Sequence, residues 1–322
     1  MKTLVTGGAG FIGSHLVERL LLTNRQVIIL DDFSGGSKKN LDLAYLNGSL
    51  EIVSGSILDQ NLISKLMERS DQCYHLAASL GVSKINSEPF LSFNTNFIGS
   101  EIVLSQASKR KVRTIFASSS EVYGKNPNMP LNENSDRVLG STKIPRWSYS
   151  EAKALDELYA FELNKKENFP VTIARFFNTV GPRQNSSYGM VLPKFVKSAM
   201  LNQPLVVFGN GLQTRSFCSV TDAVLAIEQL MNSVSSIGQA FNVGSPVEIS
   251  ILDLAAKVIN LTNSNSKIVF KEYSDEFGND FEEPYRRVPD IAKIQETIAW
   301  KPRISLDSII AETIAYIKAN EI

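Results

Sequence analysis

The chain has 322 residues, and its 33 lysines and arginines balance its 33 aspartates and glutamates. This neutrality gives no electrostatic basis for binding nucleic acid or an anionic membrane, so any phosphate must be held by a local site. A hydrophobic content of 43% is typical of a globular protein rather than a disordered one.

Two cysteines exclude a disulfide framework, and no cluster of histidines, cysteines and acids has the spacing of a metal site. No apolar run reaches the length of a membrane-spanning helix, and the opening MKTLVTGG leaves no room for a signal peptide. We therefore expect a cytoplasmic protein of one or two domains without a bound metal.

Short apolar runs alternate with helical patterns in the first half of the chain. The predicted strands are Thr3–Thr6, Gln26–Leu30, Leu50–Val53, Gln72–Leu76, Thr114–Ser118 and Val171–Arg175. The predicted helices between them are Ile12–Thr23, Gln60–Arg69, Phe97–Lys109 and Ser150–Lys166. This βαβ alternation predicts an α/β fold with a doubly wound parallel sheet of the Rossmann type.

The composition and pattern of the sequence change from about Asn178, where prolines and glycines become frequent and the alternation of strands and helices is lost. Beyond this point we predict a strand at Gln239–Val243, a helix from about Ile251 to Leu261 and a loop at Glu272–Val288. The expected division is a cofactor-binding domain of residues 1–177 with about 218–245, and a smaller, partly interleaved α/β substrate domain of residues 178–217 with about 246–322.

Gly7, Gly10 and Gly13 form a G-x-x-G-x-x-G pattern between the first predicted strand and the first predicted helix. Glycines there permit a tight turn and let the backbone approach a pyrophosphate, which then faces the helix N-terminus. Asp31 ends the second predicted strand, where an acid binds both hydroxyls of an adenosine ribose and repels a 2′-phosphate. The pattern predicts NAD rather than NADP, with Asp32 as a second candidate for this contact. The alternative is a glycine turn without a cofactor.

Tyr149 and Lys153 are four residues apart at the start of a predicted helix, so they share one helix face. A lysine ammonium near a phenol is expected to lower the phenol pKa toward the range of a general base. Ser119 and Ser120 follow a predicted strand, at the edge of the sheet where ligands bind in this architecture. The alternatives are an exposed helix pair and a solvated serine loop.

These motifs together resemble the extended short-chain dehydrogenase/reductase family, which includes nucleotide-sugar epimerases, dehydratases and decarboxylases. The resemblance covers essentially the whole chain. Its motifs are TGGAGFIGSHL (Thr6–Leu16), SSSEVYG (Ser118–Gly124), YSEAK (Tyr149–Lys153) and ARFFNTVGPRQ (Ala174–Gln184).

The family mechanism implies that Tyr149 takes the proton of a sugar 4-hydroxyl while hydride passes to NAD. Lys153 would hold the nicotinamide ribose and tune Tyr149, and Ser119 would hydrogen-bond the reacting oxygen. Further cofactor contacts are expected from Phe11, Ile12, Ser56, Ile57, Leu76, Ala77, Ala78 and Asn96. Ser56 departs from the family, which often has an aspartate near the adenine at this position.

Three segments resemble the UDP-glucuronate decarboxylase branch: the serine motif, PRWSYS (Pro145–Ser150) and Phe277–Phe281 leading to Arg286-Arg287. In that branch an arginine at the position of Arg287 faces the sugar carboxylate and is implicated in proton donation after carbon dioxide leaves. Glu121 is expected to act with Ser120 in a proton relay. A pyrophosphate clamp is an equal alternative for Arg287, because arginine suits both anions. Phe281 stands where the branch has a tyrosine.

The resemblance also implies a nucleotide site in the second domain. Asn178 would meet the pyrophosphate, Arg215 a phosphate oxygen and Phe208 the base, with Val191 as a further contact. His75, on a buried predicted strand, is expected to be structural. A UDP-sugar is favoured and a GDP-sugar stays open.

We predict UDP-glucuronate decarboxylation from this set of residues. Nucleotide-hexose 4-epimerisation, or a dehydrogenase or dehydratase yielding a 4-keto nucleotide-sugar, is the alternative within the family. A non-catalytic dinucleotide-binding regulator is the alternative outside it. A homodimer is implied by the resemblance alone, through the helices at Phe97–Lys109 and Ser150–Lys166.

Overall fold

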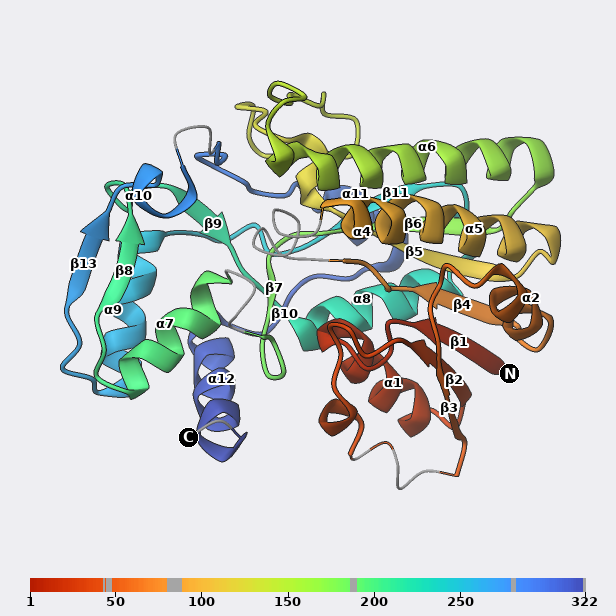
Figure 1. Cartoon of the computed structure of the whole chain (residues 1–322), viewed down its shortest axis with the longest axis horizontal. Helices are drawn as coiled ribbons and strands as arrows, with labels where there is room; N and C mark the ends of the chain where they lie inside the picture. Colours follow the sequence, from red (N-terminus) through yellow and green to blue (C-terminus); the bar gives the residue numbers. More distant parts are fainter. Residues whose placement is uncertain (43, 45–47, 80–88, 186–189, 279–281, 321–322) are drawn as a thin grey trace.

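The chain forms two units that lie side by side (Figure 1). The larger unit contains the N-terminus and a parallel sheet, and the smaller contains the C-terminal helix. The computed structural model describes residues 1–322 except 43, 45–47, 80–88, 186–189, 279–281 and 321–322.

The larger unit is built on a seven-stranded sheet in the described part of the chain. Its strands are β1 (Lys2–Thr6), β2 (Gln26–Asp31), β3 (Leu50–Ser54), β4 (Gln72–His75), β5 (Arg113–Ser119), β6 (Val171–Phe176) and β11 (Ala240–Val243). Their order is β11-β6-β5-β4-β1-β2-β3, and every neighbouring pair is parallel. The order reverses direction at β1, so the predicted doubly wound α/β fold is confirmed.

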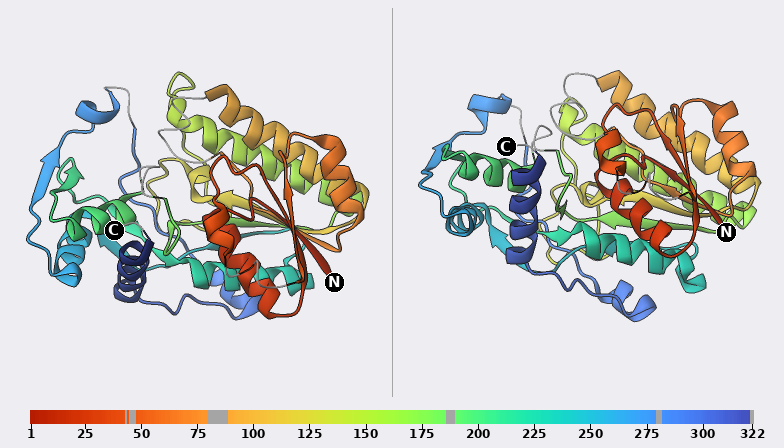
Figure 2. Two further views of the ribbon diagram at one scale, coloured as in Figure 1. Left: turned by 60° about the horizontal axis from the view of Figure 1, so that its bottom comes forward. Right: turned by 90° about the horizontal axis from the view of Figure 1, so that it is seen from below.

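Helices cover both faces of this sheet, which explains why its strands are short and apolar (Figure 2). One face is covered by α1 (Phe11–Leu22) and α8 (Val220–Asn232), and the other by α2 (Gln60–Glu68), α5 (Ser100–Lys109) and α6 (Ser148–Glu167). The predicted helix at Phe97–Lys109 begins earlier than expected. The chain is already helical in α4 (Pro89–Phe93) and then forms a π-helical segment, Asn94–Gly99.

The smaller unit has an apolar core of its own, to which Leu192, Leu254 and Ile310 contribute. Its helices are α7 (Val191–Met200), α9 (Ile251–Thr262), α10 (Ser274–Phe277) and α12 (Leu306–Asn320). Its strand pairs are β8 (Leu205–Phe208) with β13 (Ile268–Lys271), and β9 (Thr214–Ser216) with β12 (Glu248–Ser250). The predicted loop at Glu272–Val288 therefore contains a short helix, α10.

Two connections tie the units together. β7 (Thr179–Val180) pairs with β10 (Cys218–Ser219) where the chain leaves and re-enters the larger unit. After the smaller unit, α11 (Ala292–Ile298) returns to the larger one, and its Ile294 packs in the same apolar core as α1 and α8. The assignment of residues to two domains stays a prediction.

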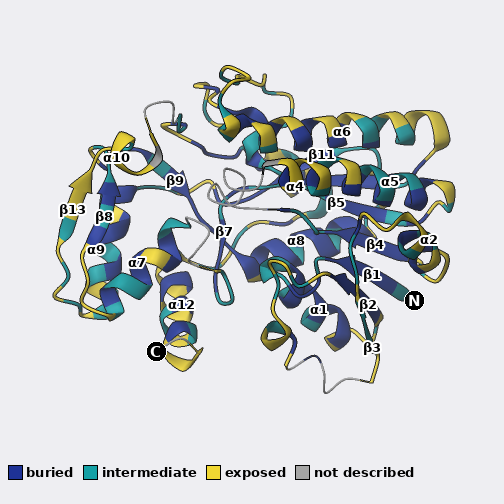
Figure 3. Ribbon diagram, viewed as in Figure 1, coloured by how far each residue is buried: buried dark blue, intermediate teal, exposed yellow. Residues whose placement is uncertain are grey.

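Figure 3 shows exposed residues along α4 and α6, and several of them are large and apolar. Phe90 is 85% exposed, and Leu155 and Leu158 are also exposed. Within the described ranges, no helix combines the length and the apolar character needed to cross a membrane. The expected cytoplasmic location stays a prediction.

Candidate active site

The candidate site lies at the carboxyl edge of the sheet, because parallel strands end there together. Thr6, His75 and Ser119 are the last residues of three adjacent strands, β1, β4 and β5. The segments that follow these strands carry the glycine loop, Leu76–Ala78 and the short 3-10 helix Ser120–Tyr123. The three predicted motifs are thus brought to one edge.

The glycine loop has the shape that a pyrophosphate requires. Gly7 has φ +72°, and a Cβ on it would lie 2.8 Å from the backbone nitrogen of Ala77. A Cβ on Gly13 would overlap the carbonyl oxygen of Gly7. Gly10 is the N-cap residue of α1, and glycine has no side chain that could accept a hydrogen bond. The backbone N–H groups of the first turn of α1 therefore receive no side-chain cap from Gly10 and can bind an anion. These residues fit a dinucleotide such as NAD.

Asp31 closes this loop from the end of β2. It is 7% exposed, and its carboxylate accepts hydrogen bonds from the backbone nitrogens of Ala9 and Phe33, both at 2.8 Å. Burial raises its pKa, and the two backbone hydrogen bonds oppose the rise. Each oxygen keeps a second lone pair for a ribose hydroxyl. Asp32 is exposed and accepts from the nitrogen of Ser34 at 2.9 Å, so Asp31 is the acid that lies at the loop.

The other predicted cofactor residues lie around the same edge. Phe11 and Ile12 are half-buried at the start of α1, and Leu76, Ala77 and Ala78 are half-buried after β4. Ile57 is buried, and the Ser56 hydroxyl accepts a hydrogen bond from the nitrogen of Leu58 at 3.2 Å.

The side-chain amide of Asn96 is hydrogen-bonded to the segment that follows β4, and its predicted cofactor contact stays a prediction. Its amide oxygen accepts from the nitrogen of Ser79 at 2.7 Å, and its amide nitrogen donates to the Ser79 carbonyl at 2.9 Å and to the Ser92 hydroxyl at 3.3 Å. Both N–H donors are therefore used within the protein, and Asn96 fixes the chain that follows β4.

Tyr149 is the second residue of α6, and the side chain of Ser119 hydrogen-bonds its phenol. Burial raises the pKa of Tyr149, the charges of Glu121 and Asp156 raise it further, and the Ser119 hydrogen bond opposes the rise. The expected net lowering of the Tyr149 pKa is therefore wrong for the protein alone, because burial and the charges of two acids raise it.

Lys153 lies one turn further along α6 and is buried. Its Nζ is 4.6 Å from the centre of the Phe116 ring and 3.9 Å from Oδ2 of Asp156. Burial lowers the pKa of Lys153, and the nearby acids oppose this. His75 bridges Thr6 Oγ1 and Ser100 Oγ at 2.7 and 3.2 Å, and its pKa falls to about 3 through burial and the charge of Lys153. These are the contacts of a neutral, structural histidine.

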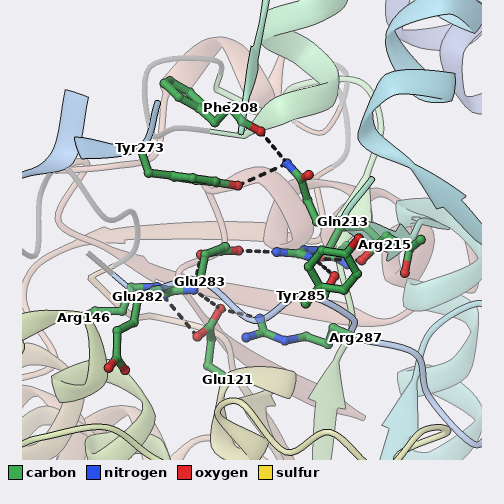
Figure 4. A network of polar contacts seen from close by, with 12 residues as sticks. Glu121, Arg146, Phe208, Gln213, Arg215, Tyr273, Glu282, Glu283, Tyr285 and Arg287 are labelled. Atoms are coloured by element: carbon green, nitrogen blue, oxygen red, sulfur yellow. Dashed lines mark hydrogen bonds and ion pairs between the residues drawn. The ribbon is translucent and has the colours of Figure 1, made fainter. Parts of the chain in front are cut away.

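On the substrate side, Glu121 lies between two arginines (Figure 4). Arg287 Nη1 donates to Oε1 at 2.5 Å, and Arg146 Nη1 lies 3.1 Å from Oε2. Burial alone would raise the pKa of Glu121, but Arg287 and Arg146 lower it to about 2. Glu121 is thus a carboxylate at any working pH and has no proton to give, so its predicted part in a relay with the buried Ser120 is limited to accepting one.

Arg287 is the least satisfied polar group of this set. It is 3% exposed, and its Nε and Nη2 have no hydrogen-bond partner among the described residues. Buried donors without partners are rare, because each one costs desolvation energy. Two such donors on one guanidinium indicate a ligand with oxygen atoms.

Arg146 continues the network into the smaller unit. It donates to Glu283 Oε2 at 3.0 Å, and the other oxygen of Glu283 accepts from Arg215 (Figure 4). Arg215 also donates to the carbonyl of Thr214 at 2.7 Å. The sequence patterns did not indicate Glu283 and pointed to Arg146 only as part of a motif. Their pairing spans 137 residues, and no local pattern signals it.

The predicted nucleotide residues are placed as follows. Phe208 stacks on Tyr273 with ring centres 5.4 Å apart and planes 30° apart. Asn178 has φ +26° and donates from its amide to the Ser216 carbonyl at 3.0 Å, and Val191 is half-buried at the start of α7. Residues 279–281 lie outside the described residues.

In the part of the chain that is described, no group of three or more histidines, cysteines and acids is placed to hold a metal.

A Rossmann sheet with a glycine loop, an acid after β2 and a Ser–Tyr–Lys set defines a nucleotide-dependent oxidoreductase site. Comparison with known proteins identifies the family. The family model described as GDP-mannose 4,6 dehydratase matches residues 4–313. The chain belongs to the extended short-chain dehydrogenase/reductase family and is an NAD-dependent nucleotide-sugar-modifying enzyme, as predicted.

Two relatives and one solved structure illustrate the similarity. The chain is 39% identical over 321 residues to the UDP-N-acetyl-alpha-D-glucosaminuronate decarboxylase of Bacillus cytotoxicus, covering 99% of this chain and 98% of that protein. It is 35% identical over 309 residues to UDP-glucuronic acid decarboxylase 4 of Arabidopsis thaliana, covering 95% and 66%. The UDP-glucuronic acid 4-epimerase of Bacillus cereus, solved with UDP-glucuronic acid and NAD, has a TM-score of 0.88 at 28% identity, covering 99% of both chains.

Proposed function

We propose that this enzyme decarboxylates a UDP-linked hexuronate, with UDP-glucuronate as the first candidate substrate. The observation that carries the proposal is Arg287, a buried cation with two donors that no described residue pairs. It contacts Glu121, whose charge also acts on Tyr149, so Arg287 and the base lie around one site. A guanidinium with free donors matches a carboxylate in charge and in geometry.

The residues of the cofactor side would carry out the first step. Tyr149 removes the proton of the sugar 4-hydroxyl, and Ser119, already hydrogen-bonded to the phenol, orients the reacting oxygen. Lys153 contributes a positive charge on the same helix face. NAD would be held by the glycine loop and Asp31, and when bound it would supply reversible hydride acceptance, so that the whole cycle is redox-neutral.

The residues of the substrate side would control the fate of the 4-keto sugar. Its carboxylate is β to the ketone, so carbon dioxide leaves without a further catalyst once it is correctly oriented. Arg287 holds the carboxylate and, by resemblance, takes part in delivering the proton that replaces carbon dioxide. The carboxylate of Glu121 keeps the Arg287 guanidinium aligned. One proton from solvent is consumed in each cycle, and the cofactor is regenerated.

The nucleotide would lie against the smaller unit. Arg215 is a phosphate ligand in this proposal. One or more of its N–H groups would bind the diphosphate, so its hydrogen bond to Glu283 must break or rearrange. The stacked pair of Phe208 and Tyr273 offers an aromatic surface for the base. Asn178 adds an amide near the pyrophosphate.

A second substrate has support from one observation. The relative with 39% identity is named for UDP-N-acetylglucosaminuronate, whereas the UDP-glucuronate decarboxylase of Arabidopsis is 35% identical. Both substrates carry the same carboxylate and the same 4-hydroxyl chemistry, and they differ at C2. Arg287 and Tyr149 therefore do not distinguish between them.

The test is to incubate the purified enzyme with each UDP-uronate and to analyse the nucleotide-sugars by mass spectrometry. We expect a UDP-pentose from UDP-glucuronate, or its N-acetylated counterpart from the second substrate. A 4-epimer that retains the carboxyl group, or a 4-keto sugar with reduced cofactor, would contradict decarboxylation. The similarity to a UDP-glucuronate 4-epimerase makes the epimer the main rival product.

We also propose that the enzyme is a homodimer formed by the exposed apolar face of α4 and α6. Phe90, Phe93, Leu155 and Leu158 lie on this face, the last three of them around a shallow groove, and a second copy would cover them. Light scattering of the wild type should give the mass of two chains, and Leu158→Glu should give one. Val234→Glu, at an exposed apolar residue elsewhere, should leave the dimer intact. A monomeric wild type would refute the proposal.

A further inference from the structure

A buried acid that the proposed chemistry does not use lies next to the catalytic lysine. Asp156 of α6 is 1% exposed, and its Oδ2 is 3.9 Å from Nζ of Lys153, which is 2% exposed. In the part of the chain that the structure describes, no group hydrogen-bonds to this oxygen. A buried carboxylate oxygen without hydrogen bonds costs stability, so its position beside Lys153 calls for a function.

The other acid near Lys153 already has its own cation. Glu157 accepts hydrogen bonds from Arg175 Nη2 at 2.6 Å and from Arg175 Nε at 2.9 Å. The Ser118 hydroxyl donates to the same carboxylate at 2.5 Å. Arg175 therefore balances most of the negative charge of Glu157, which leaves Glu157 with little effect on Lys153.

The remaining groups packed around Lys153 bring no negative charge. The Phe116 ring lies below the ammonium, and His75 on β4 is neutral. Burial raises the pKa of Asp156, whereas the Lys153 ammonium and the Ser100 hydroxyl lower it, so its carboxylate form depends on the lysine. Around Lys153, within the described residues, Asp156 is the acid whose charge no arginine balances.

We propose that Asp156 is a positioning residue, whose carboxylate keeps the buried Lys153 protonated and holds its ammonium at the cofactor edge of the sheet. The inference rests on the proposed function, in which Tyr149 is the base and Lys153 is its charged partner. Without a nearby anion, an ammonium among Phe116, His75 and other uncharged groups would tend to lose its proton.

Removing this charge has two effects of the same sign. Burial lowers the pKa of Lys153, and Asp156 and then Glu157 oppose it, so loss of Asp156 lowers that pKa further. Burial raises the pKa of Tyr149, with Glu121 and then Asp156 adding to the rise, so loss of Asp156 lowers this pKa as well. Because catalysis needs a deprotonated Tyr149 and a protonated Lys153, both limbs of the pH profile should move to lower pH.

Asp156→Asn tests this by removing the charge at nearly constant shape. In the NAD-loaded enzyme we expect both limbs of the kcat profile to move down by about one pH unit, with KM little changed. Asp156→Glu restores a carboxylate and should move the limbs back. Glu162→Gln removes an exposed acid from the same helix and should leave the profile in place. Limbs that stay at their wild-type pH while the rate falls equally at every pH would overturn the proposal.

A second measurement needs no turnover and separates this inference from the proposed function. Carbon-13 labelling of lysine allows Lys153 to be titrated by NMR, with its signal assigned by Lys153→Arg. We expect Lys153 to titrate at lower pH in Asp156→Asn than in the wild type, whether or not a UDP-uronate is turned over. Equal titration in both proteins would overturn the inference, even if decarboxylation is confirmed.

Discussion

The cofactor side and the substrate side of this site are built in different ways. On the cofactor side the backbone makes the shape: Gly7 and Gly13 leave room for a close approach, and both oxygens of Asp31 already accept hydrogen bonds. On the substrate side, long charged side chains form the site, and Arg287 retains two donors without partners within the described ranges. The first side is complete before a ligand arrives, whereas the second is a set of ion pairs that a ligand must complete or rearrange.

This difference determines what a substitution should do. On the cofactor side, an added atom collides with backbone, which cannot move without deforming β1 and α1. On the substrate side, the loss of one partner leaves another charge buried and unpaired. We expect such a substitution to weaken binding of the anionic substrate. The predictions below test these two expectations.

The largest effect is expected at the base that both sides share. Tyr149→Phe removes the group that accepts the 4-hydroxyl proton and should lower kcat by about 10²–10⁴-fold, with NAD binding retained. Steady-state rates and NAD titration measure the two quantities. Tyr159→Phe, on the same helix but hydrogen-bonded to Glu101, is the control and should keep the rate. An unchanged rate for Tyr149→Phe would mean that another group is the base.

Arg287→Lys tests the substrate side. It retains the charge but loses the planar fork, so kcat/KM for the UDP-uronate should fall by about 100-fold. Binding of UDP alone, measured by calorimetry, should change little. If UDP binding falls equally, Arg287 is a pyrophosphate clamp rather than a carboxylate ligand. Arg286→Lys, at an exposed arginine paired with Glu248, is the matched control.

Gly13→Ala tests the cofactor side. Its Cβ would meet the Gly7 carbonyl oxygen, so we expect about tenfold weaker NAD binding and a lower melting temperature. UDP binding by the smaller unit, which has an apolar core of its own, should be spared. Gly48→Ala adds a Cβ in open space and should leave both quantities unchanged. Normal NAD affinity in Gly13→Ala would show that the loop is not the pyrophosphate site.

The smallest effect is expected at Ser56, where the chain departs from its family. Ser56→Asp supplies an acceptor near the expected adenine and can still accept from the Leu58 nitrogen, so the local turn is preserved. NAD affinity should rise about twofold to fivefold, which corresponds to about 0.5–1 kcal/mol for one added hydrogen bond. Ser56→Ala should leave it nearly unchanged. A weaker affinity in Ser56→Asp would place the adenine elsewhere.

Sequence patterns predicted the cofactor side better than the substrate side, because the cofactor side is formed by short stretches of backbone. The six strands predicted in the first half are confirmed within one or two residues, because buried parallel strands and amphipathic helices have strong local periodicities. Gly7, Gly13 and Asp31 act through a short stretch of backbone, so their spacing alone indicates their arrangement. The helices α4 and α10, which were not predicted, are too short to show such a pattern.

The substrate side depends on contacts between distant segments. Glu121 and Arg287 are 166 residues apart, and Arg146 reaches Glu283 across 137 residues. A sequence pattern could not place these groups together, and only family resemblance pointed to Arg287. The pKa of Tyr149 was misjudged for a related reason, since burial and the acids around it are tertiary properties.

The most direct test of the central claim is the fate of the substrate carboxyl carbon. UDP-glucuronate and UDP-N-acetylglucosaminuronate, each labelled with carbon-13 at the carboxyl group, are given to the purified enzyme with NAD. We predict labelled carbon dioxide and an unlabelled UDP-pentose or its N-acetylated counterpart in equal amounts, without net reduction of NAD, from at least one of the two. Retention of the label in a UDP-hexuronate with inverted C4 would contradict decarboxylation and identify the enzyme as an epimerase.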